Sequence, residues 1–137
     1  MKKLDCILLV DDDDDCNYFH KKLLKEMECA NHVEVATDGQ EALDFLLSIK
    51  NNKHPQPQII FLDINMPVMD GWEFLEEYEK LKPNQKAQVV LVMLTTSLNP
   101  DDHERAKKFS VLSDFHNKLL TESKVMDLFK KHFPEHL

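Results

Sequence analysis

Residues 59–62, Ile-Ile-Phe-Leu, form an unbroken apolar run near the centre of the chain, with no alternation of polar and apolar positions. Such a run is typical of a strand whose two faces are both covered, as in a parallel sheet between helices. Asp63 follows directly, where the strand leaves the sheet. Open α/β folds keep their chemistry at that edge, so the run predicts both a sheet and a functional carboxylate.

The same arrangement recurs along the chain. Four more strands are predicted, at residues 6–10, 33–36, 89–94 and 111–116. The first ends in five aspartates that begin at Asp11, the run at 89–94 ends at Thr95, and Lys118 follows the last strand. Apolar positions every three to four residues predict helices between and after the strands, at residues 16–27, 40–50, 72–81, 99–109 and 121–132.

Strands that alternate with helices of this length predict an α/β fold with right-handed crossovers and a doubly wound, five-stranded parallel sheet. Helices should cover both faces, and residues 1–137 should form a single domain. The carboxyl ends of parallel strands share one edge of the sheet. Asp11, Asp12, Asp63, Thr95 and Lys118 are therefore expected to meet there.

In the first helix, the inward-facing stripe is expected at Cys16, Phe19, Leu23 and Met27. The remaining aspartates of the run, Asp13 to Asp15, are interpreted as a solvated helix start in which one residue acts as the N-cap.

The composition and charge of the chain limit the kinds of function that it can have. A net charge of -8 argues against a nucleic-acid-binding surface, and no apolar stretch approaches the roughly 20 residues of a membrane span. The three cysteines have no Cys-x-x-Cys spacing, and the charged N-terminus does not fit a signal peptide. The expected location is therefore the cytoplasm, with reduced thiols.

Carboxylates gathered in a small site repel one another unless a cation sits among them, and oxygen ligands suit Mg²⁺. A lysine and a threonine opposite them would add a positive charge and a hydroxyl donor, which together fit a phosphoryl group. The glycine-rich loops that cradle nucleotide phosphates are missing from the sequence. The phosphoryl group must then come from elsewhere, with Asp63 as the nucleophile that receives it.

These residues resemble the receiver domain of two-component response regulators. The resemblance rests on Asp11-Asp12, on the stretch from Leu62 to Gly71 (Leu-Asp-Ile-Asn-Met-Pro-Val-Met-Asp-Gly), on Thr95 and on Lys118. It covers essentially the whole chain, and the stretches at 72–75 and 94–97 are most similar to stand-alone receivers of the cyanobacterial-phytochrome type. The resemblance implies a flavodoxin-like sheet with strand order 2-1-3-4-5.

The family implies that Asp63 takes a phosphoryl group from a sensor histidine kinase or a histidine phosphotransfer protein. It also implies that Asp12, Asp63 and the main-chain carbonyl of Asn65 bind Mg²⁺, with Asp11 acting through water, and that Lys118 offsets charge on the moving oxygens. Such a chain promotes its own phosphorylation and dephosphorylation and is not a turnover enzyme.

Further family roles concern the lifetime of the phosphate and the output. Asn65 and Ser97 stand where relatives tune hydrolysis, and Thr95 and Phe115 stand where relatives switch the surface formed by the last two helices. With no second domain, the output is expected through contact with an unidentified downstream protein or onward phosphotransfer. A homodimer is a further partner that the sequence leaves open.

The chain departs from the family after Lys118, where Leu119 replaces the usual proline. A cis bond before a residue other than proline costs about 2.5–4 kcal/mol, which favours a trans bond here.

Two other functions remain open: a Mg²⁺-dependent phosphohydrolase with an aspartyl-phosphate intermediate, and an interaction module that is never phosphorylated. The usual hydrolase acid/base aspartate, two residues beyond the nucleophile, is replaced here by Asn65.

Overall fold

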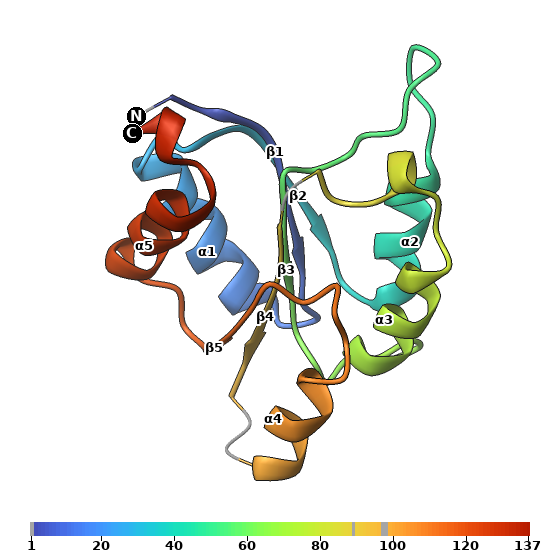
Figure 1. Cartoon of the computed structure of the whole chain (residues 1–137). Coiled ribbons are helices and arrows are strands. Elements are labelled where there is room, and N and C mark those ends of the chain that lie inside the picture. Colours follow the sequence, from blue (N-terminus) through green and yellow to red (C-terminus); the bar gives the residue numbers. More distant parts are fainter. Residues whose placement is uncertain (1, 89, 97–98) are drawn as a thin grey trace.

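A computed structural model of the chain describes residues 2–88, 90–96 and 99–137. In it, five parallel strands form one sheet in the order β2-β1-β3-β4-β5, with helices on both faces (Figure 1). The predicted flavodoxin-like fold and strand order are thus confirmed. The strands are β1 (Leu4–Val10), β2 (Ala30–Ala36), β3 (Ile59–Leu62), β4 (Val90–Thr95) and β5 (Asp114–Asn117). The helices are α1 (Asp14–Glu26), α2 (Gly39–Leu47), α3 (Gly71–Glu79), α4 (Pro100–Ala106) and α5 (Glu122–His132), with short 3-10 helices η1 (Pro83–Gln85) and η2 (Pro134–His136).

Both faces of the sheet are covered, which explains the unbroken apolar run of β3. Ile60 and Leu62 pack into a core shared with α2 and α3. Ile59 and Phe61 point the other way, into a core shared with α1 and α5. Figure 1 shows these two helical layers on opposite sides of the sheet. Because successive strand residues face opposite sides, a strand between two such layers must be apolar at every position.

The register of the strands aligns their carboxyl ends. Val10 pairs with Leu62 of β3, and Leu62 pairs with Met93 of β4. At the far side, Thr95 pairs with Asn117 of β5. The residue after β1, the residue after β3 and the residue after β5 therefore leave the sheet at one edge.

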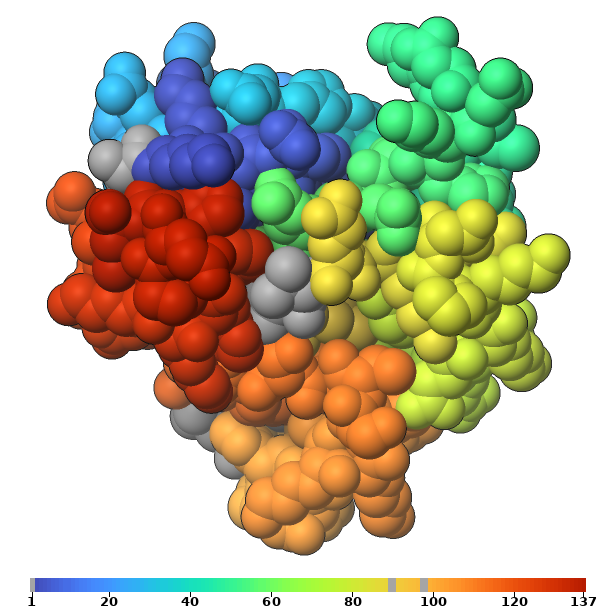
Figure 2. All heavy atoms as spheres, turned by 45° about the horizontal axis from the view of Figure 1, so that its top comes forward, coloured from blue at the N-terminus to red at the C-terminus, as the bar shows by residue number. Residues whose placement is uncertain are grey.

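The opposite edge holds the two chain ends. The main-chain N–H of Lys2 donates to the carbonyl of His136 at 2.6 Å. Figure 2 shows these segments, blue and red, lying against each other, while the loop near residue 50 projects from the molecule. Among the described residues, no helix is both long and apolar enough to cross a membrane.

Helix α1 departs from the sequence prediction. Its fully buried residues are Asn17, His20 and Leu24. Of the predicted stripe, Leu23 and Met27 pack half-buried against the core and Cys16 is half-buried, whereas Phe19 is exposed. Phe19 keeps 45% of its surface exposed. The helix thus buries two polar side chains, which is favourable only where they find hydrogen-bond partners. Those partners lie in two loops of the candidate site.

Candidate functional site: an acidic pocket at the carboxyl edge of the sheet

Asp63 leaves β3 with its carboxylate buried, its residue only 8% exposed. Its main-chain N–H donates to the carbonyl of Val10 at 2.9 Å, which continues the pairing with β1 for one more residue. The start of α3 folds back onto this point, because the N–H of Gly71 donates to the carbonyl of Ile64 at 2.7 Å. A Cβ on Gly71 would collide with the main-chain carbonyl of Asp63. The Asp70-Gly71 turn of the sequence is therefore needed for this close approach.

The loop after β1 supplies the other carboxylates. Asp11 is buried, its Oδ1 accepts from the N–H of Asp13 at 3.0 Å, and its carbonyl accepts from Asn17 Nδ2 at 2.7 Å. Asp12, next to it, is exposed. Asp13 caps α1 by accepting from the N–H groups of Asp15 and Cys16. The prediction that one of the later aspartates is an N-cap is confirmed, and Asp13 is that residue.

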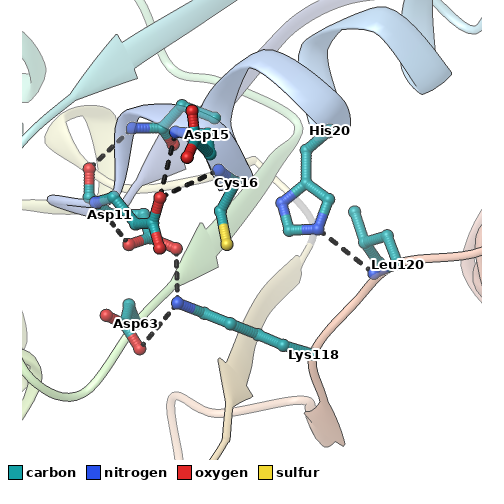
Figure 3. A network of polar contacts seen from close by, with 9 residues as sticks. Asp11, Asp15, Cys16, His20, Asp63, Lys118 and Leu120 are labelled. Carbon is teal, nitrogen blue, oxygen red and sulfur yellow. Dashed lines mark hydrogen bonds and ion pairs between the residues drawn. The ribbon is translucent and has the colours of Figure 1, made fainter.

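Lys118 crosses the pocket from the end of β5 and joins the two buried carboxylates (Figure 3). Its Nζ lies 2.6 Å from Asp11 Oδ2 and 3.3 Å from Asp63 Oδ1. The side chain is 8% exposed, so these ion pairs are shielded from solvent. The main-chain N–H of Lys118 donates to the carbonyl of Thr95 at 2.9 Å, which ties its base to β4.

The electrostatics of the pocket favour a further cation. Burial, and next the charge of Asp11, raise the pKa of Asp63 to about 6 against the opposing effect of Lys118. Burial by itself would lower the pKa of Lys118, but its hydrogen bonds and charge contacts with Asp11 and Asp63 outweigh burial and raise it. One lysine therefore does not fully offset the burial of Asp63 together with the repulsion from Asp11.

A metal ion fits the donor set of this pocket. Asp11, Asp12 and Asp63 each offer one carboxylate oxygen, and these oxygens lie within 4.8 Å of one another. Oxygen donors on a partly open rim suit hard divalent cations, which keep several waters when they bind proteins. The acidic cluster can therefore bind a metal.

The other residues of the predicted site have different surroundings. Thr95 is buried at the end of β4 and Asn65 is exposed two residues beyond Asp63. Phe115 is half-buried in β5, its ring centroid 4.4 Å from that of His103 on α4. The prediction for Ser97 lies outside the described residues.

The loop after β5 differs from the sequence expectation. The peptide bond between Lys118 and Leu119 is cis, where a trans bond was expected. Lys124, in the first turn of α5, donates to the carbonyls of Asn117 and Leu119, both at 3.0 Å. The N–H of Leu120 donates to Nε2 of His20 at 3.2 Å. Main-chain groups on both sides of Lys118 are thus hydrogen-bonded.

Two residues of this network, Asn17 and His20, were not singled out by the sequence analysis. Both stand on the buried face of α1, where polar residues offer no hydrophobic signal. Burial lowers the pKa of His20 despite the nearby charge of Asp11, so its ring is neutral. Their spacing in the sequence could have identified them. Asn17 and His20 are three residues apart, which places both side chains on one helix face above the aspartate loop.

The chain is similar in sequence and in structure to known proteins over most of its length. The family model described as "Response regulator receiver domain" matches residues 7–130. Response regulator Rcp1 of Synechocystis sp. is 35% identical over 126 residues, which cover 90% of this chain and 81% of Rcp1. The crystal structure of a two-component response regulator from Cytophaga hutchinsonii has a TM-score of 0.82 at 28% identity, covering 95% of this chain and 97% of that one. The Mn²⁺-bound form of Rcp1 has a TM-score of 0.69 at 29% identity, covering 93% and 88%.

Proposed function

Because the chain belongs to the response regulator receiver domain family, we propose that Asp63 is its phosphate acceptor and that the donor is a phosphohistidine. The family expected from the sequence is confirmed, and receiver domains are the phosphoacceptors of two-component signalling. The observation that carries the residue assignment is the buried Asp63 carboxylate, with Lys118 Nζ at 3.3 Å and two further aspartates beside it.

In the proposed reaction, a carboxylate oxygen of Asp63 attacks phosphorus in line with the bond to the donor imidazole. The new O–P bond forms as the N–P bond breaks, and the electron pair of that bond stays on the imidazole nitrogen, which then takes up a proton from solvent. The product is an acyl phosphate on Asp63. Besides the nucleophile, the protein contributes positioning and charge stabilisation, because the charge of the transition state lies on the phosphoryl oxygens.

Lys118 supplies positive charge to the phosphoryl oxygens. Its Nζ already lies between Asp11 and Asp63, so a small swing of the ammonium group keeps it beside a phosphate on Asp63. We propose that Thr95, which is buried at the end of the neighbouring strand, donates its hydroxyl to a phosphoryl oxygen. Buried donors of this kind act strongly because water does not screen them.

The proposed metal is Mg²⁺, held by Asp12, Asp63 and the main-chain carbonyl of Asn65, with Asp11 acting through water. When bound, it would supply positive charge that offsets the charge on the phosphoryl oxygens. The Mn²⁺-bound form of Rcp1 supports a divalent ion at this kind of site. The mutual distances of the aspartate oxygens support it in this chain.

The output is proposed to pass through Thr95 and Phe115. Thr95 turns toward the new phosphate, Phe115 moves into the space it leaves, and the surface of α4 and α5 shifts between two populated states. Phe115 contacts His103 of α4, which supports a link from β5 to that surface. Asn65 and Ser97 are proposed to set the rate at which water removes the phosphate.

Receiver domains work with histidine kinases and downstream effectors. For this chain we propose a sensor histidine kinase or a histidine phosphotransfer protein as the donor, a protein as the downstream target, and the cytoplasm as the location. The competing hydrolase would need an acid/base group two residues beyond Asp63, and the amide of Asn65 does not titrate near neutral pH. A turnover assay with small phosphomonoesters separates the two, since only the hydrolase sustains many turnovers.

The assignment of Asp63 is tested with acetyl phosphate and Mg²⁺. The wild-type chain should take up one acid-stable, base-labile phosphoryl group, and Asp63→Asn should take up none. Asp15→Asn, an exposed aspartate in the first turn of α1, is the matched control and should label like the wild type. Stoichiometric label on Asp63→Asn refutes the proposal.

A further inference from the structure

Helix α1 carries two buried polar side chains one turn apart, and each holds a different loop of the site. Asn17 Nδ2 donates to the carbonyl of Asp11, in the loop that brings the aspartates. His20 Nε2 accepts from the N–H of Leu120, in the loop that brings Lys118. The exposed fractions of Asn17 and His20 are 5% and 2%, so bulk solvent does not compete for these two hydrogen bonds. One face of one helix therefore connects the acidic loop to the lysine loop.

The contact made by His20 spans 100 positions in the sequence. Figure 3 shows the ring reaching from α1 to Leu120, beside the extended side chain of Lys118. Leu120 is itself buried, at 1% exposed. Loss of the ring acceptor would leave a buried N–H without a partner, a situation that folded chains avoid by moving the backbone or admitting water.

The other anchors of this loop lie on different sides. The N–H of Lys118 is held by Thr95 of β4, and the carbonyls of Asn117 and Leu119 are held by Lys124 of α5. Among the described residues, the hydrogen bond between the N–H of Leu120 and His20 ties this loop to α1. α1 is also the helix that begins at the aspartate loop. This bond therefore fixes the position of Lys118 relative to the carboxylates of that loop.

We propose that His20 is a positioning residue for the phosphoryl-transfer reaction: it holds the loop after β5 so that Lys118 reaches Asp63. The proposal rests on the proposed function of Asp63 and assigns His20 no contact with the phosphoryl group. A misplacement of about 1 Å at a reacting centre can cost up to roughly 10²-fold in rate. Loss of the tether should therefore slow phosphorylation while the aspartate loop, whose Asp11 carbonyl Asn17 holds, stays in place.

The bond also dictates the tautomer of His20. Nε2 accepts the N–H of Leu120, so in the neutral ring the proton must lie on Nδ1. Nitrogen-15 NMR of the wild-type chain should find this Nδ1–H form, with a coupling across the hydrogen bond between Leu120 N and His20 Nε2. A ring protonated on Nε2 overturns the proposal, and this measurement needs no variant to fold.

The functional test compares two substitutions of His20. His20→Leu removes the acceptor and keeps a buried apolar side chain, whereas His20→Gln offers an amide oxygen near the position of Nε2. Leu24→Val is the matched control, because it removes one methylene from the same buried face of α1 and leaves the ring acceptor of His20 in place. Each chain is characterised by its urea unfolding curve, its Mg²⁺ affinity by titration calorimetry, and its rate of labelling by acetyl phosphate at saturating Mg²⁺.

We expect His20→Leu to lower the labelling rate about tenfold, with the final stoichiometry and the Mg²⁺ affinity unchanged. His20→Gln should recover most of the rate, and Leu24→Val should label at the wild-type rate. An unchanged rate in His20→Leu, or an equal loss in Leu24→Val, overturns the role of His20. Failure of the wild-type chain to label would instead overturn the proposed function of Asp63, so the two failures are distinguishable.

Discussion

The two helical layers that cover the sheet differ in what they bury. The layer of α2 and α3 buries mostly apolar side chains, and the hydroxyl of Tyr78 within it accepts from the N–H of Ala87 at 2.9 Å. The layer of α1 and α5 has a comparable apolar core but also buries Asn17 and His20. The buried residues of α2 and α3 are Gly39, Ala42, Leu43, Leu46, Gly71, Trp72, Phe74, Leu75 and Tyr78.

This difference follows from what each layer must hold. The aspartate loop leads into α1, and the lysine loop leads into α5, so both loops of the site are attached to one layer. Side chains buried there can fix the loops by hydrogen bonds, which have direction, whereas apolar contacts have none. The α2 and α3 layer meets the site chiefly where Gly71 packs against Asp63. We therefore expect the layer of α2 and α3 to affect mainly the stability of the fold. The layer of α1 and α5 should affect both the stability of the fold and the geometry of the site.

The largest effect should come from the apolar layer. Phe74 is fully buried on α3, and Phe74→Ala should lower the free energy of unfolding by about 3–5 kcal/mol because it leaves a cavity. Labelling per folded molecule should not change. The matched substitution is Phe19→Ala on α1, where 45% exposure limits the loss to less than about 1 kcal/mol. Urea unfolding measures both free energies, and equal losses in Phe74→Ala and Phe19→Ala would contradict the expected difference between the two layers.

A second effect concerns the charge of the pocket. The pKa of Asp63 is about 6 in the folded chain, against about 3.9 for an unfolded one. Between these values the folded state holds the proton that the unfolded state has lost, so stability falls as pH rises from about 4 to about 6. The fall should amount to at most roughly 3 kcal/mol in metal-free protein.

Asp63→Asn removes this titration, and its stability should exceed that of the wild type above about pH 6. Urea unfolding at a series of pH values in the presence of a chelator checks the difference between the two chains. A wild-type curve that runs parallel to that of Asp63→Asn across this range would contradict the expected cost of the buried carboxylate.

A third effect separates the two polar side chains of α1. Asn17→Ala should weaken Mg²⁺ binding about tenfold, because residues that orient metal ligands typically carry effects of 10–100-fold. The labelling rate at saturating Mg²⁺ should stay near the wild-type value, the reverse of what we expect for His20→Leu. Calorimetry and labelling on the two variants make a paired test, and matching defects in both would mean that α1 acts as one unit.

The smallest effect concerns a helix start in the apolar layer. Asp70 caps α3 through the N–H of Glu73, and the Glu73 side chain accepts from the N–H of Asp70 in return. Asp70→Ala should cost about 1 kcal/mol, while Asp70→Ser keeps an acceptor and should cost less. Mg²⁺ affinity should be unchanged in both, as measured by calorimetry. A clear loss of affinity would place α3 among the elements that shape the site.

The sequence alone determined the sheet and the edge where the site lies. The apolar run of β3 is typical of a strand covered on both faces, and Asp11, Asp63 and Lys118 each follow a strand directly. Parallel strands bring such residues to one edge, so their meeting could be predicted without coordinates. The cap by Asp13 was predictable in kind, since short acidic side chains favour helix starts.

Only the tertiary structure decided which face of α1 is buried and what Lys118 contacts. The apolar stripe through Phe19 was a sound inference from periodicity, yet the buried face carries Asn17 and His20. Their burial depends on partners that the helix does not contain: a carbonyl six residues away and an N–H a hundred residues away. A prediction from hydrophobic periodicity assumes that polar side chains stay exposed, because burying them is costly. A hydrogen bond to a distant residue offsets this cost, and that bond exists only once the chain has folded.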